Sequence, residues 1–338
     1  MPATKFKVVS MGKISGSSTE TESKELAKLN IKADFVPARP TNEDDMIAAA
    51  KDADVIMGGG RFLTRRVMES LPKLRAIVTY SVGFDGIDVD AATDNGIVVV
   101  NNPARAWCVE EVSNHAMALL LACAKKLTIL NDVVKKGRWQ DSRKIMPPMA
   151  SIHGQTLGII GCGDIGRAVG RKAECFGLTL IGADPYVDKS AAVDCGIKLM
   201  SMRDLLRRSD FVSAHTPLER ETYHLIGEAE FKLMKPTAYF INTSRGSVVD
   251  EPAMIRALQQ GLIAGAGLDV FEKEPIDSEN PLLKMENVIT LPHSASYSDA
   301  ALEVQPVNPA QEVGRILTGR WPKNPVNPKV KPKVALAK

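Results

Sequence analysis

Residues 156–184 read TLGIIGCGDIGRAVGRKAECFGLTLIGAD, and this stretch decides the fold. It opens with an apolar run at 156–160, and a second apolar run at 178–181 is followed closely by Asp184. Between the two runs, apolar residues recur at roughly helical spacing over 165–176. The order of strand, tight turn, helix, strand and acidic residue predicts a βαβ unit with parallel strands.

The turn of this unit carries glycines at the spacing G-x-G-x-x-G, namely Gly161, Gly163 and Gly166. The first allows a sharp turn, the second lets a pyrophosphate approach the backbone, and the third lets the helix pack against the sheet. The N–H groups at the helix N-terminus then face the phosphates. A glycine-rich turn in some other α/β domain is the alternative. The flanking strands, the helix and the acid favour a dinucleotide site.

Asp184 lies 23 residues after Gly161, where a carboxylate can accept hydrogen bonds from both hydroxyls of an adenosine ribose. The same carboxylate would repel a 2′-phosphate. No lysine or arginine follows before Lys189 to compensate for that repulsion. We therefore expect NAD rather than NADP as the cofactor.

Composition sets the outer limits of the interpretation. A chain of 338 residues is long for one core, so we expect two domains. A net charge of +3 is too small to indicate nucleic-acid binding. The five cysteines show no metal-ligand spacing, and neither a signal peptide nor an apolar run long enough to cross a bilayer is visible. We expect no metal, no membrane partner and a cytoplasmic location.

Short apolar runs alternate with segments of helical pattern before residue 104. We expect strands at 6–9, 33–36, 53–57, 74–78 and 97–100, and helices at 20–29, 44–50 and 65–70. Thr64 is expected to cap the third helix. Because ligands bind beyond the carboxyl ends of parallel strands, the loops at 58–61 and 80–85 are candidate walls of a substrate site.

The remainder of the chain begins with a long helix expected over 108–130 and a polar connecting arm over 132–152. After the nucleotide unit we expect a helix at 201–208 and strands at 211–214, 239–242, 266–270 and 288–290. The tail from Pro322 is rich in proline and lysine, and we expect it to be irregular and partly mobile.

Three polar residues follow the last three of these strands: Arg245, Glu274 and His293. Strand ends of a doubly wound sheet meet at one crevice. Hydride transfer to a 2-keto acid needs such a set. A guanidinium can hold the carboxylate in two places and polarise the ketone, and an imidazolium can donate a proton. A carboxylate beside the imidazole favours its charged form and fixes its orientation.

Together these motifs closely resemble the D-isomer-specific 2-hydroxyacid dehydrogenase family. The resemblance covers most of the chain, and its motifs lie at 81–85, 102–103, 157–166, 215–218, 241–246, 268–275 and 292–293. It implies an α/β protein with two doubly wound domains. A flavodoxin-like substrate domain would comprise residues 1–104 and 297–338, and a Rossmann NAD-binding domain, 105–296, would be inserted in it.

The resemblance also implies the site residues and the assembly. Arg245, Glu274 and His293 would be catalytic. Substrate contacts would come from Ser81, Val82, Gly83 and Arg245, and cofactor contacts from Gly161, Gly163, Asp164, Ile165, Gly166, Asp184, His215, Thr216, Pro217, Thr243, Asp269 and Val112. Within this set, Asp269 would hold the nicotinamide amide and Val112 would pack near the nicotinamide ring. Such proteins are usually homodimers joined through their cofactor domains.

The leading hypothesis is an NAD-dependent enzyme that interconverts a D-2-hydroxy acid and a 2-keto acid. The segments 109–112 and 293–298 resemble the branch that contains the C-terminal-binding corepressors, beside phosphoglycerate dehydrogenase-like members. A non-enzymatic NAD(H)-responsive binding protein is therefore the alternative. Oxidation of formate or phosphite on the same scaffold stays open within the enzyme class.

Some residues depart from the family pattern or have an open role. Ser81 stands where glycine is common, and Pro306 and Pro309 interrupt what is usually a continuous helix. Arg61 is a candidate contact for a second anionic group of the substrate, with an exposed surface arginine as the alternative. Of the histidines, His215 is expected near the cofactor but not as proton donor, and the other candidates for packing or surface roles are His115, His153 and His224.

Overall fold

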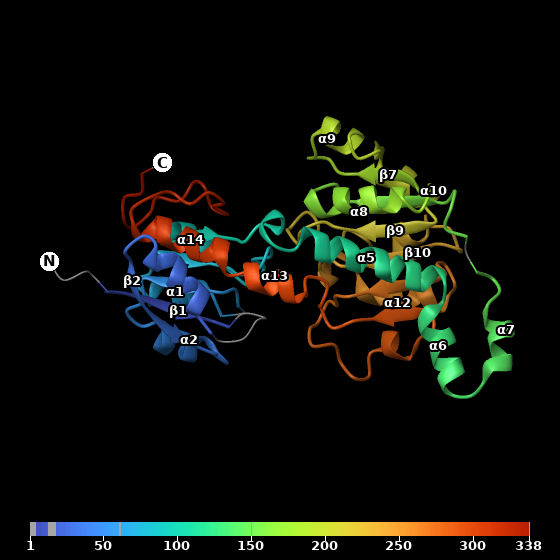
Figure 1. The fold of residues 1–338 in the computed structure, drawn as a ribbon, viewed down its shortest axis with the longest axis horizontal. Coiled ribbons are helices and arrows are strands. Elements are labelled where there is room, and N and C mark those ends of the chain that lie inside the picture. Colours follow the sequence, from blue (N-terminus) through green and yellow to red (C-terminus); the bar gives the residue numbers. More distant parts are fainter. Residues whose placement is uncertain (1–4, 13–17, 61, 150, 338) are drawn as a thin grey trace. The chain divides into compact units, whose positions relative to one another are not determined.

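The computed structural model describes residues 5–12, 18–60, 62–149 and 151–337. The chain separates into two compact units: unit 1 comprises residues up to 108 and from 298 onward, and unit 2 comprises 109–297. The domain limits expected from the sequence fall after residues 104 and 296. Unit 2 is inserted in unit 1, and both are parallel α/β structures (Figure 1).

Unit 1 is built on a five-stranded sheet in the order β2-β1-β3-β4-β5, which is the flavodoxin-like order. All neighbouring strands are parallel. The strands are β1 (Lys5–Ser10), β2 (Lys32–Pro37), β3 (Val55–Met57), β4 (Ala76–Val78) and β5 (Val98–Val100). The helices are α1 (Glu20–Ala27), α2 (Glu43–Ala50), α3 (Arg65–Glu69), α4 (Val89–Asp94), α13 (Asp299–Val304) and α14 (Val307–Leu317). The strands β3, β4 and β5 are fully buried because helices cover both faces of the sheet.

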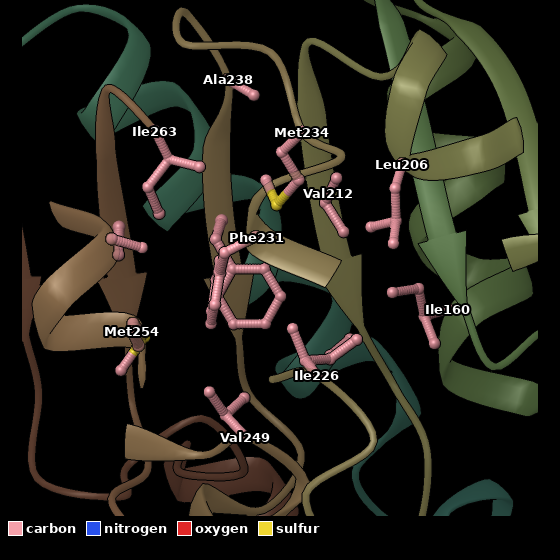
Figure 2. Packing of buried hydrophobic residues seen from close by; sticks show 14 of the residues in the cluster. Ile160, Leu206, Val212, Ile226, Phe231, Met234, Ala238, Val249, Met254 and Ile263 are labelled. Atoms are coloured by element: carbon pink, nitrogen blue, oxygen red, sulfur yellow. The ribbon is translucent and has the colours of Figure 1, made fainter. Parts of the chain in front are cut away.

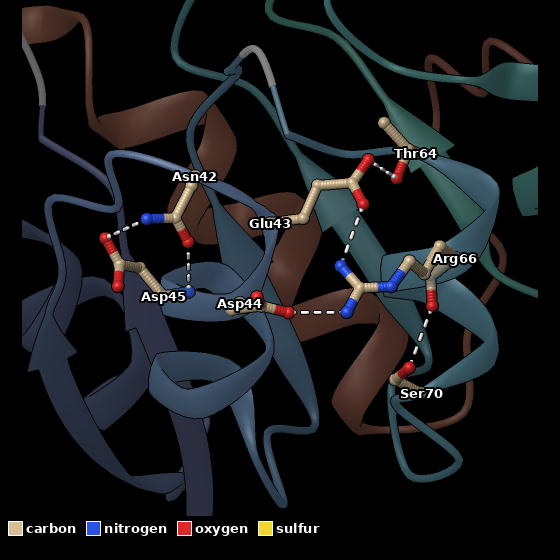
Figure 3. Close-up of polar contacts among 7 residues, drawn as sticks. All are labelled: Asn42, Glu43, Asp44, Asp45, Thr64, Arg66 and Ser70. Atoms are coloured by element: carbon tan, nitrogen blue, oxygen red, sulfur yellow. Dashed lines mark hydrogen bonds and ion pairs between the residues drawn. The ribbon is translucent and has the colours of Figure 1, made fainter.

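Thr64 precedes α3, but in the described part of the chain its side chain makes no capping hydrogen bond. Its hydroxyl donates instead to Glu43 Oε1 at 2.7 Å, and Arg66 Nη1 donates to Glu43 Oε2 at 3.0 Å. Glu43 begins α2, so the N-terminal ends of α2 and α3 are joined (Figure 3). The cap predicted at Thr64 is therefore wrong, because a carboxylate of the neighbouring helix takes its hydroxyl.

The C-terminal part of unit 1 bears out the expected interruption at Pro306. The helical region divides into α13 and α14 there. The interruption expected at Pro309 is wrong, because this residue lies in the first turn of α14, where a proline costs no internal hydrogen bond. The tail that follows is irregular, as expected, but it is not free of the sheet. Asn327 is 5% exposed, accepts a hydrogen bond from Val99 N at 2.8 Å and donates to Ile97 O at 2.9 Å.

Unit 2 is built on a seven-stranded parallel sheet in the order β12-β11-β10-β9-β6-β7-β8. The strands are β6 (Thr156–Ile160), β7 (Thr179–Ala183), β8 (Lys198–Leu199), β9 (Phe211–Ala214), β10 (Tyr239–Asn242), β11 (Gly265–Leu268) and β12 (Val288–Thr290). The chain reverses its direction of progress across the sheet between β6 and β9. In a doubly wound sheet this switch point is where a ligand binds, beyond the carboxyl ends of the strands.

Two helical layers cover the sheet of unit 2. The helices α5 (Val109–Ala124) and α8 (Asp164–Glu174) pack together on one face, and the other carries α10 (Met202–Arg208), α11 (Glu228–Phe231) and α12 (Glu251–Gln259). A short helix, α9 (Lys189–Val193), precedes β8. Phe231 lies among the buried apolar side chains under the second layer (Figure 2). Its ring packs edge-on against that of Phe240, with ring centroids 5.7 Å apart. Buried packing on both faces makes the strand ends a rigid support for the site.

The helix expected over 108–130 is wrong, because α5 ends at Ala124 and α6 (Leu127–Lys135) begins after a break. Lys126 at the break is left-handed, with φ of +52°, and its Nζ donates to Ile145 O at 2.8 Å. Ile145 ends α7 (Ser142–Ile145) in the connecting arm. Neither glycine nor proline marks the break in the sequence. The arm of α6 and α7 extends away from the body of unit 2 (Figure 1).

Candidate active site

The glycine turn of unit 2 has the shape that a dinucleotide requires. Gly161 is left-handed, with φ of +87°, and an added Cβ would lie 2.8 Å from the backbone of His215. A Cβ on Gly166 would lie 2.1 Å from Gly161 O, so only glycine lets α8 approach the turn. A Cβ on Gly163 meets no described atom within 4 Å, which leaves space open at the N-terminus of α8. The turn thus fits a pyrophosphate on a helix N-terminus.

Asp184 lies directly after β7, beside the glycine turn. Its Oδ2 accepts a hydrogen bond from Cys162 N at 2.8 Å, and its Oδ1 accepts from Tyr186 N at 2.8 Å and Val187 N at 3.0 Å. The carboxylate is partly exposed and therefore available to a ligand. It also joins the glycine turn to the end of β7, which is a structural role that its position alone did not indicate.

Polar atoms without partners gather along the same strand ends. Within the described residues, no hydrogen-bond partner is found for the buried atoms Thr216 Oγ1, Thr243 Oγ1 and His215 Nδ1. The other ring nitrogen of His215 lies 2.8 Å from Ser213 Oγ. Burial lowers the pKa of His215 from 6.5 to about 4, so this imidazole is neutral near pH 7. Buried polar groups normally have partners, and these atoms fit a polar ligand such as a dinucleotide.

The remaining residues expected around the cofactor lie on or beside these elements. Asp164 and Ile165 are the first two residues of α8, and Val112 is buried in α5. Pro217 is exposed in the segment after β9. Arg167, which the sequence interpretation missed, donates to Cys162 O at 2.9 Å and to Asp164 Oδ1 at 2.8 Å and so places a cation beside the turn.

Arg245 follows β10 in a loop that Asn242 holds in shape. The side chain of Asn242 accepts hydrogen bonds from Ser244 N at 3.0 Å and Ser244 Oγ at 2.8 Å, and it donates to Arg245 O at 2.9 Å. Gly246 then packs directly against the loop after β11, because an added Cβ would lie 1.9 Å from Phe271 C. This backbone contact brings the loop of Arg245 to the loop that carries Glu274.

Glu274 and His293 form a direct pair. His293 Nδ1 lies 2.8 Å from Glu274 Oε2, and Glu274 Oε1 accepts a hydrogen bond from Phe271 N at 3.0 Å. Burial pushes the pKa of Glu274 upward, but the hydrogen bonds from His293 and Phe271 N and the nearby charge of Arg245 outweigh it, and the pKa stays below its ordinary value. Glu274 is thus a carboxylate near pH 7, so Nδ1 donates and Nε2 is left for proton transfer.

Asp269 holds the backbone on which His293 stands. The carboxylate is fully buried and accepts hydrogen bonds from Ser294 N at 2.9 Å and Ala295 N at 2.8 Å, while His293 N donates to Asp269 O at 2.8 Å. His115 Nε2 lies 3.4 Å from Asp269 Oδ1. His115, expected to be a packing or surface residue, is therefore a neighbour of this carboxylate. The two residues are far apart in the sequence, so no local motif predicts this contact.

The loop 81–83 of unit 1 presents its N–H groups rather than its carbonyls. Ser81 O accepts hydrogen bonds from Thr79 Oγ1 at 2.6 Å and Asn102 N at 3.0 Å. Ser81 Oγ donates to Gly83 O at 2.7 Å, so this side chain is used within the loop. Among the described residues, the N–H groups of Ser81, Val82 and Gly83 find no acceptor. Arg61 lies outside the described residues.

Comparison with known proteins identifies the family. The model of the D-isomer specific 2-hydroxyacid dehydrogenase NAD binding domain matches residues 117–295. A glyoxylate reductase of Korarchaeum cryptofilum is 40% identical over 296 residues, which are 86% of this chain and 88% of that protein. The chain belongs to the D-isomer-specific 2-hydroxyacid dehydrogenase family. This dehydrogenase is also 38% identical to a D-3-phosphoglycerate dehydrogenase of Methanocaldococcus jannaschii, over 84% of this chain and 54% of that longer protein.

A solved structure agrees with the family assignment. The D-lactate dehydrogenase from Aquifex aeolicus, complexed with NAD and lactic acid, matches with a TM-score of 0.79 and 31% identity, over 93% of this chain and 96% of that one. The dehydrogenase is accordingly an NAD-dependent oxidoreductase that transfers a hydride between NAD(H) and a D-2-hydroxy acid or 2-keto acid. Because the relatives named here are enzymes, these comparisons give no support to the corepressor-like alternative.

Among the described residues, no helix is both long and apolar enough to cross a membrane. No group of three or more histidine, cysteine, aspartate or glutamate side chains that could hold a metal ion occurs in the described ranges.

Proposed function

We propose that the enzyme reduces a small 2-keto acid, with Arg245, Glu274 and His293 as the catalytic set. The observation that carries the proposal is the His293–Glu274 pair at 2.8 Å, on a carboxylate whose pKa also reflects the charge of Arg245. Arg245 would hold the carboxylate of the substrate and polarise its ketone. His293 would donate a proton from Nε2 to the ketone oxygen, and Glu274 would keep the imidazole charged and oriented. NADH supplies the hydride when bound.

Glyoxylate and hydroxypyruvate are the substrates that we propose to test first. The relatives support this choice, because one at 40% identity is named a glyoxylate reductase and another, from Yersinia enterocolitica, at 38% identity, a glyoxylate/hydroxypyruvate reductase. In unit 1, the N–H groups of Ser81, Val82 and Gly83 would donate to the carboxylate of the substrate. Arg61 stays a candidate for a second anionic group.

A keto-acid panel with NADH tests the activity. It contains glyoxylate, hydroxypyruvate, phenylpyruvate, branched-chain keto acids and sugar-derived keto acids. We expect turnover of at least one member. His293→Ala should lower that turnover by roughly 10² to 10⁴, the usual contribution of a positioned acid or base. Absence of turnover across the whole panel would contradict the proposed reaction, and full activity in His293→Ala would contradict the assigned proton donor.

We also propose a homodimer in the cytoplasm. Four apolar side chains of the α6–α7 arm are exposed beyond a third of their surface, namely Leu127, Val134, Trp139 and Met146. Exposed apolar side chains on an extended arm support contact with a second copy. None of the five cysteines, all of which the structure describes, forms a disulfide, which supports a reducing compartment. Sedimentation of the wild type and of Trp139→Ser would test the dimer, which we expect the substitution to weaken.

A further inference from the structure

A second histidine–glutamate pair lies in unit 2 beside the proposed catalytic set. His224 Nε2 lies 2.6 Å from Glu272 Oε1, and both side chains are about two-thirds buried, with 31% and 28% of their surface exposed. We propose that His224 and Glu272 form a positioning pair that fixes the loop of Arg245 against the loop of Glu274. The inference rests on the proposed roles of Arg245 and Glu274.

His224 is fixed to the Arg245 side of this arrangement. Its N–H donates to Ser247 O at 2.9 Å, and Ile226 N donates to Val248 O at 3.1 Å. The segment 224–226 therefore runs beside the residues that directly follow Arg245. The imidazole itself is held by Tyr223, whose ring stacks on it at a centroid distance of 4.0 Å. Any displacement of His224 is thus transmitted to the backbone two residues beyond Arg245.

Glu272 is fixed to the Glu274 side. Its N–H donates to Glu251 Oε2 at 3.0 Å, and Glu251 Oε1 accepts from Asn280 Nδ2 at 2.7 Å. Phe271, the preceding residue, donates its N–H to Glu274 Oε1 at 3.0 Å. The backbone of Glu272 is therefore anchored from α12, and its side chain is free to reach His224.

The pair spans the junction where the two loops already touch. A Cβ on Gly246 would lie 2.3 Å from Glu272 N, so the backbones are in direct contact with no side chain between them. Backbone contact alone allows sliding. A charge-assisted hydrogen bond from His224 to Glu272 resists that sliding, because its geometry is directional. Misplacement of reacting groups by about 1 Å can cost 10²-fold in rate, so a link of this kind affects catalysis without touching substrate.

The test compares His224→Ala, Glu272→Ala, Glu272→Gln and the double alanine variant. We expect each alanine variant to lower kcat/KM for the keto acid by roughly 10-fold to 10²-fold. The change should appear in both kcat and KM for the keto acid, while the Kd for NADH stays within about twofold of the wild type. Glu272→Gln retains an acceptor oxygen and should recover most of the loss. The double variant should be no worse than the single ones, because both remove the same link.

A matched control separates positioning from a general loss of stability. Lys232→Ala removes an ion pair of the same length, 2.6 Å to Glu228, on α11. We expect it to leave kcat, KM and the Kd for NADH unchanged. Melting temperatures of all variants identify any that fail to fold. If Glu272→Gln fails to restore the rate, or if folded alanine variants keep wild-type kcat and KM, the positioning role is overturned.

Failure of this inference differs from failure of the proposed function. His293→Ala is measured in the same assay. If His293→Ala loses turnover while His224→Ala and Glu272→Ala keep wild-type kcat and KM, only the positioning pair is overturned. Retained turnover in His293→Ala overturns the proposed catalytic set, and the positioning pair with it.

Discussion

Glu274 divides its two carboxylate oxygens between the backbone and the imidazole. Oε1 accepts from Phe271 N at 3.0 Å, and Oε2 faces His293 Nδ1 at 2.8 Å. The backbone bond fixes the direction in which the second oxygen points, and that oxygen in turn fixes the ring of His293. The orientation of the proposed proton donor is thus determined by a loop N–H three residues before Glu274.

Glu274→Gln should preserve this shape and remove the charge. The protonated imidazole then loses its stabilising neighbour, so the basic limb of the reduction profile should move to lower pH. For each pH unit by which the basic limb moves, the rate of reduction on the alkaline side should fall about tenfold. The measurement is the pH dependence of kcat/KM for keto-acid reduction, with the Kd for NADH as a control. An unmoved profile with intact activity would show that the pair has no role in proton transfer.

Arg245→Lys should impair substrate binding and turnover together. A guanidinium offers two parallel N–H donors to a carboxylate, and an ammonium cannot reproduce that grip. We expect KM for the keto acid to rise and kcat to fall, with kcat/KM lower by about 10-fold to 10²-fold, because a charged hydrogen bond contributes roughly 1.5–3 kcal/mol. Wild-type kinetics in this variant would remove Arg245 from the catalytic set.

Asp269→Asn should reduce stability in a pH-dependent way. Burial alone would raise the pKa of Asp269, but the nearby imidazole of His115 and the hydrogen bonds from Ser294 N and Ala295 N outweigh it and lower the pKa from 3.8. Because the pKa of Asp269 is lower in the folded protein than in the unfolded chain, the carboxylate stabilises the fold at pH values above its unfolded-state pKa. This contribution is lost as the pH falls through the pKa of the folded state. We expect a loss of about 1–3 kcal/mol in unfolding free energy at pH 7.

Chemical denaturation of the wild type and Asp269→Asn at pH 7 and near pH 3 measures the effect. The difference in unfolding free energy between the two proteins should be smaller at the lower pH. An equal gap at both values would mean that the charge of Asp269 does not contribute.

Asp184→Ala should change cofactor preference. Removing the carboxylate takes away the acceptor for the ribose hydroxyls and the repulsion of a 2′-phosphate. We expect kcat/KM with NADH to fall by about 10-fold to 10²-fold, as for a hydrogen bond to a charged group, while the value with NADPH changes less. The ratio of the two values is the measurement. A wild type that uses NADPH as well as NADH would contradict the role of Asp184.

Alanine substitutions at two glycines of the turn should have different effects, one on cofactor binding and the other on stability. Gly163→Ala adds a methyl group to open space, so the apo melting temperature should change little while the Kd for NADH rises. Gly166→Ala forces a Cβ to 2.1 Å from Gly161 O, and such overpacking typically costs 1–3 kcal/mol or more. Calorimetry with and without NADH distinguishes the two. Tighter binding by Gly163→Ala would contradict a close approach of the pyrophosphate.

Local patterns predicted the elements better than the breaks between them. The spacing of the glycines and Asp184 depends on residues close in sequence, and the βαβ unit formed as expected. The break at Lys126 depends on a lysine in the left-handed region that bonds to Ile145, nineteen residues on, and no local signal marks it. Thr64 failed as a cap because Glu43, from another helix, competes for its hydroxyl.

In the site too, local motifs predicted some residues, while contacts between residues distant in sequence were not predicted. Strand-end motifs pointed to Arg245, Glu274 and His293, because topology brings strand ends together. The contacts of His115 with Asp269 and of His224 with Glu272 join residues far apart in the chain. Only the packed structure brings those partners together, and single histidines without a motif gave no reason to expect them.

The nested arrangement of the two units also sets an order of events during synthesis. Unit 2 is one uninterrupted stretch, 109–297, so all of its sheet is synthesised before residues 298–338, which complete unit 1. Unit 1 is incomplete until α14 is made, because Val313 and Ile316 of α14 belong to its core. Asn327 then accepts a hydrogen bond from Val99 N at the edge of the sheet. Translation therefore leaves part of one face of the unit 1 sheet uncovered until these residues are made, and exposed apolar surface of this kind is prone to aggregation in a nascent chain.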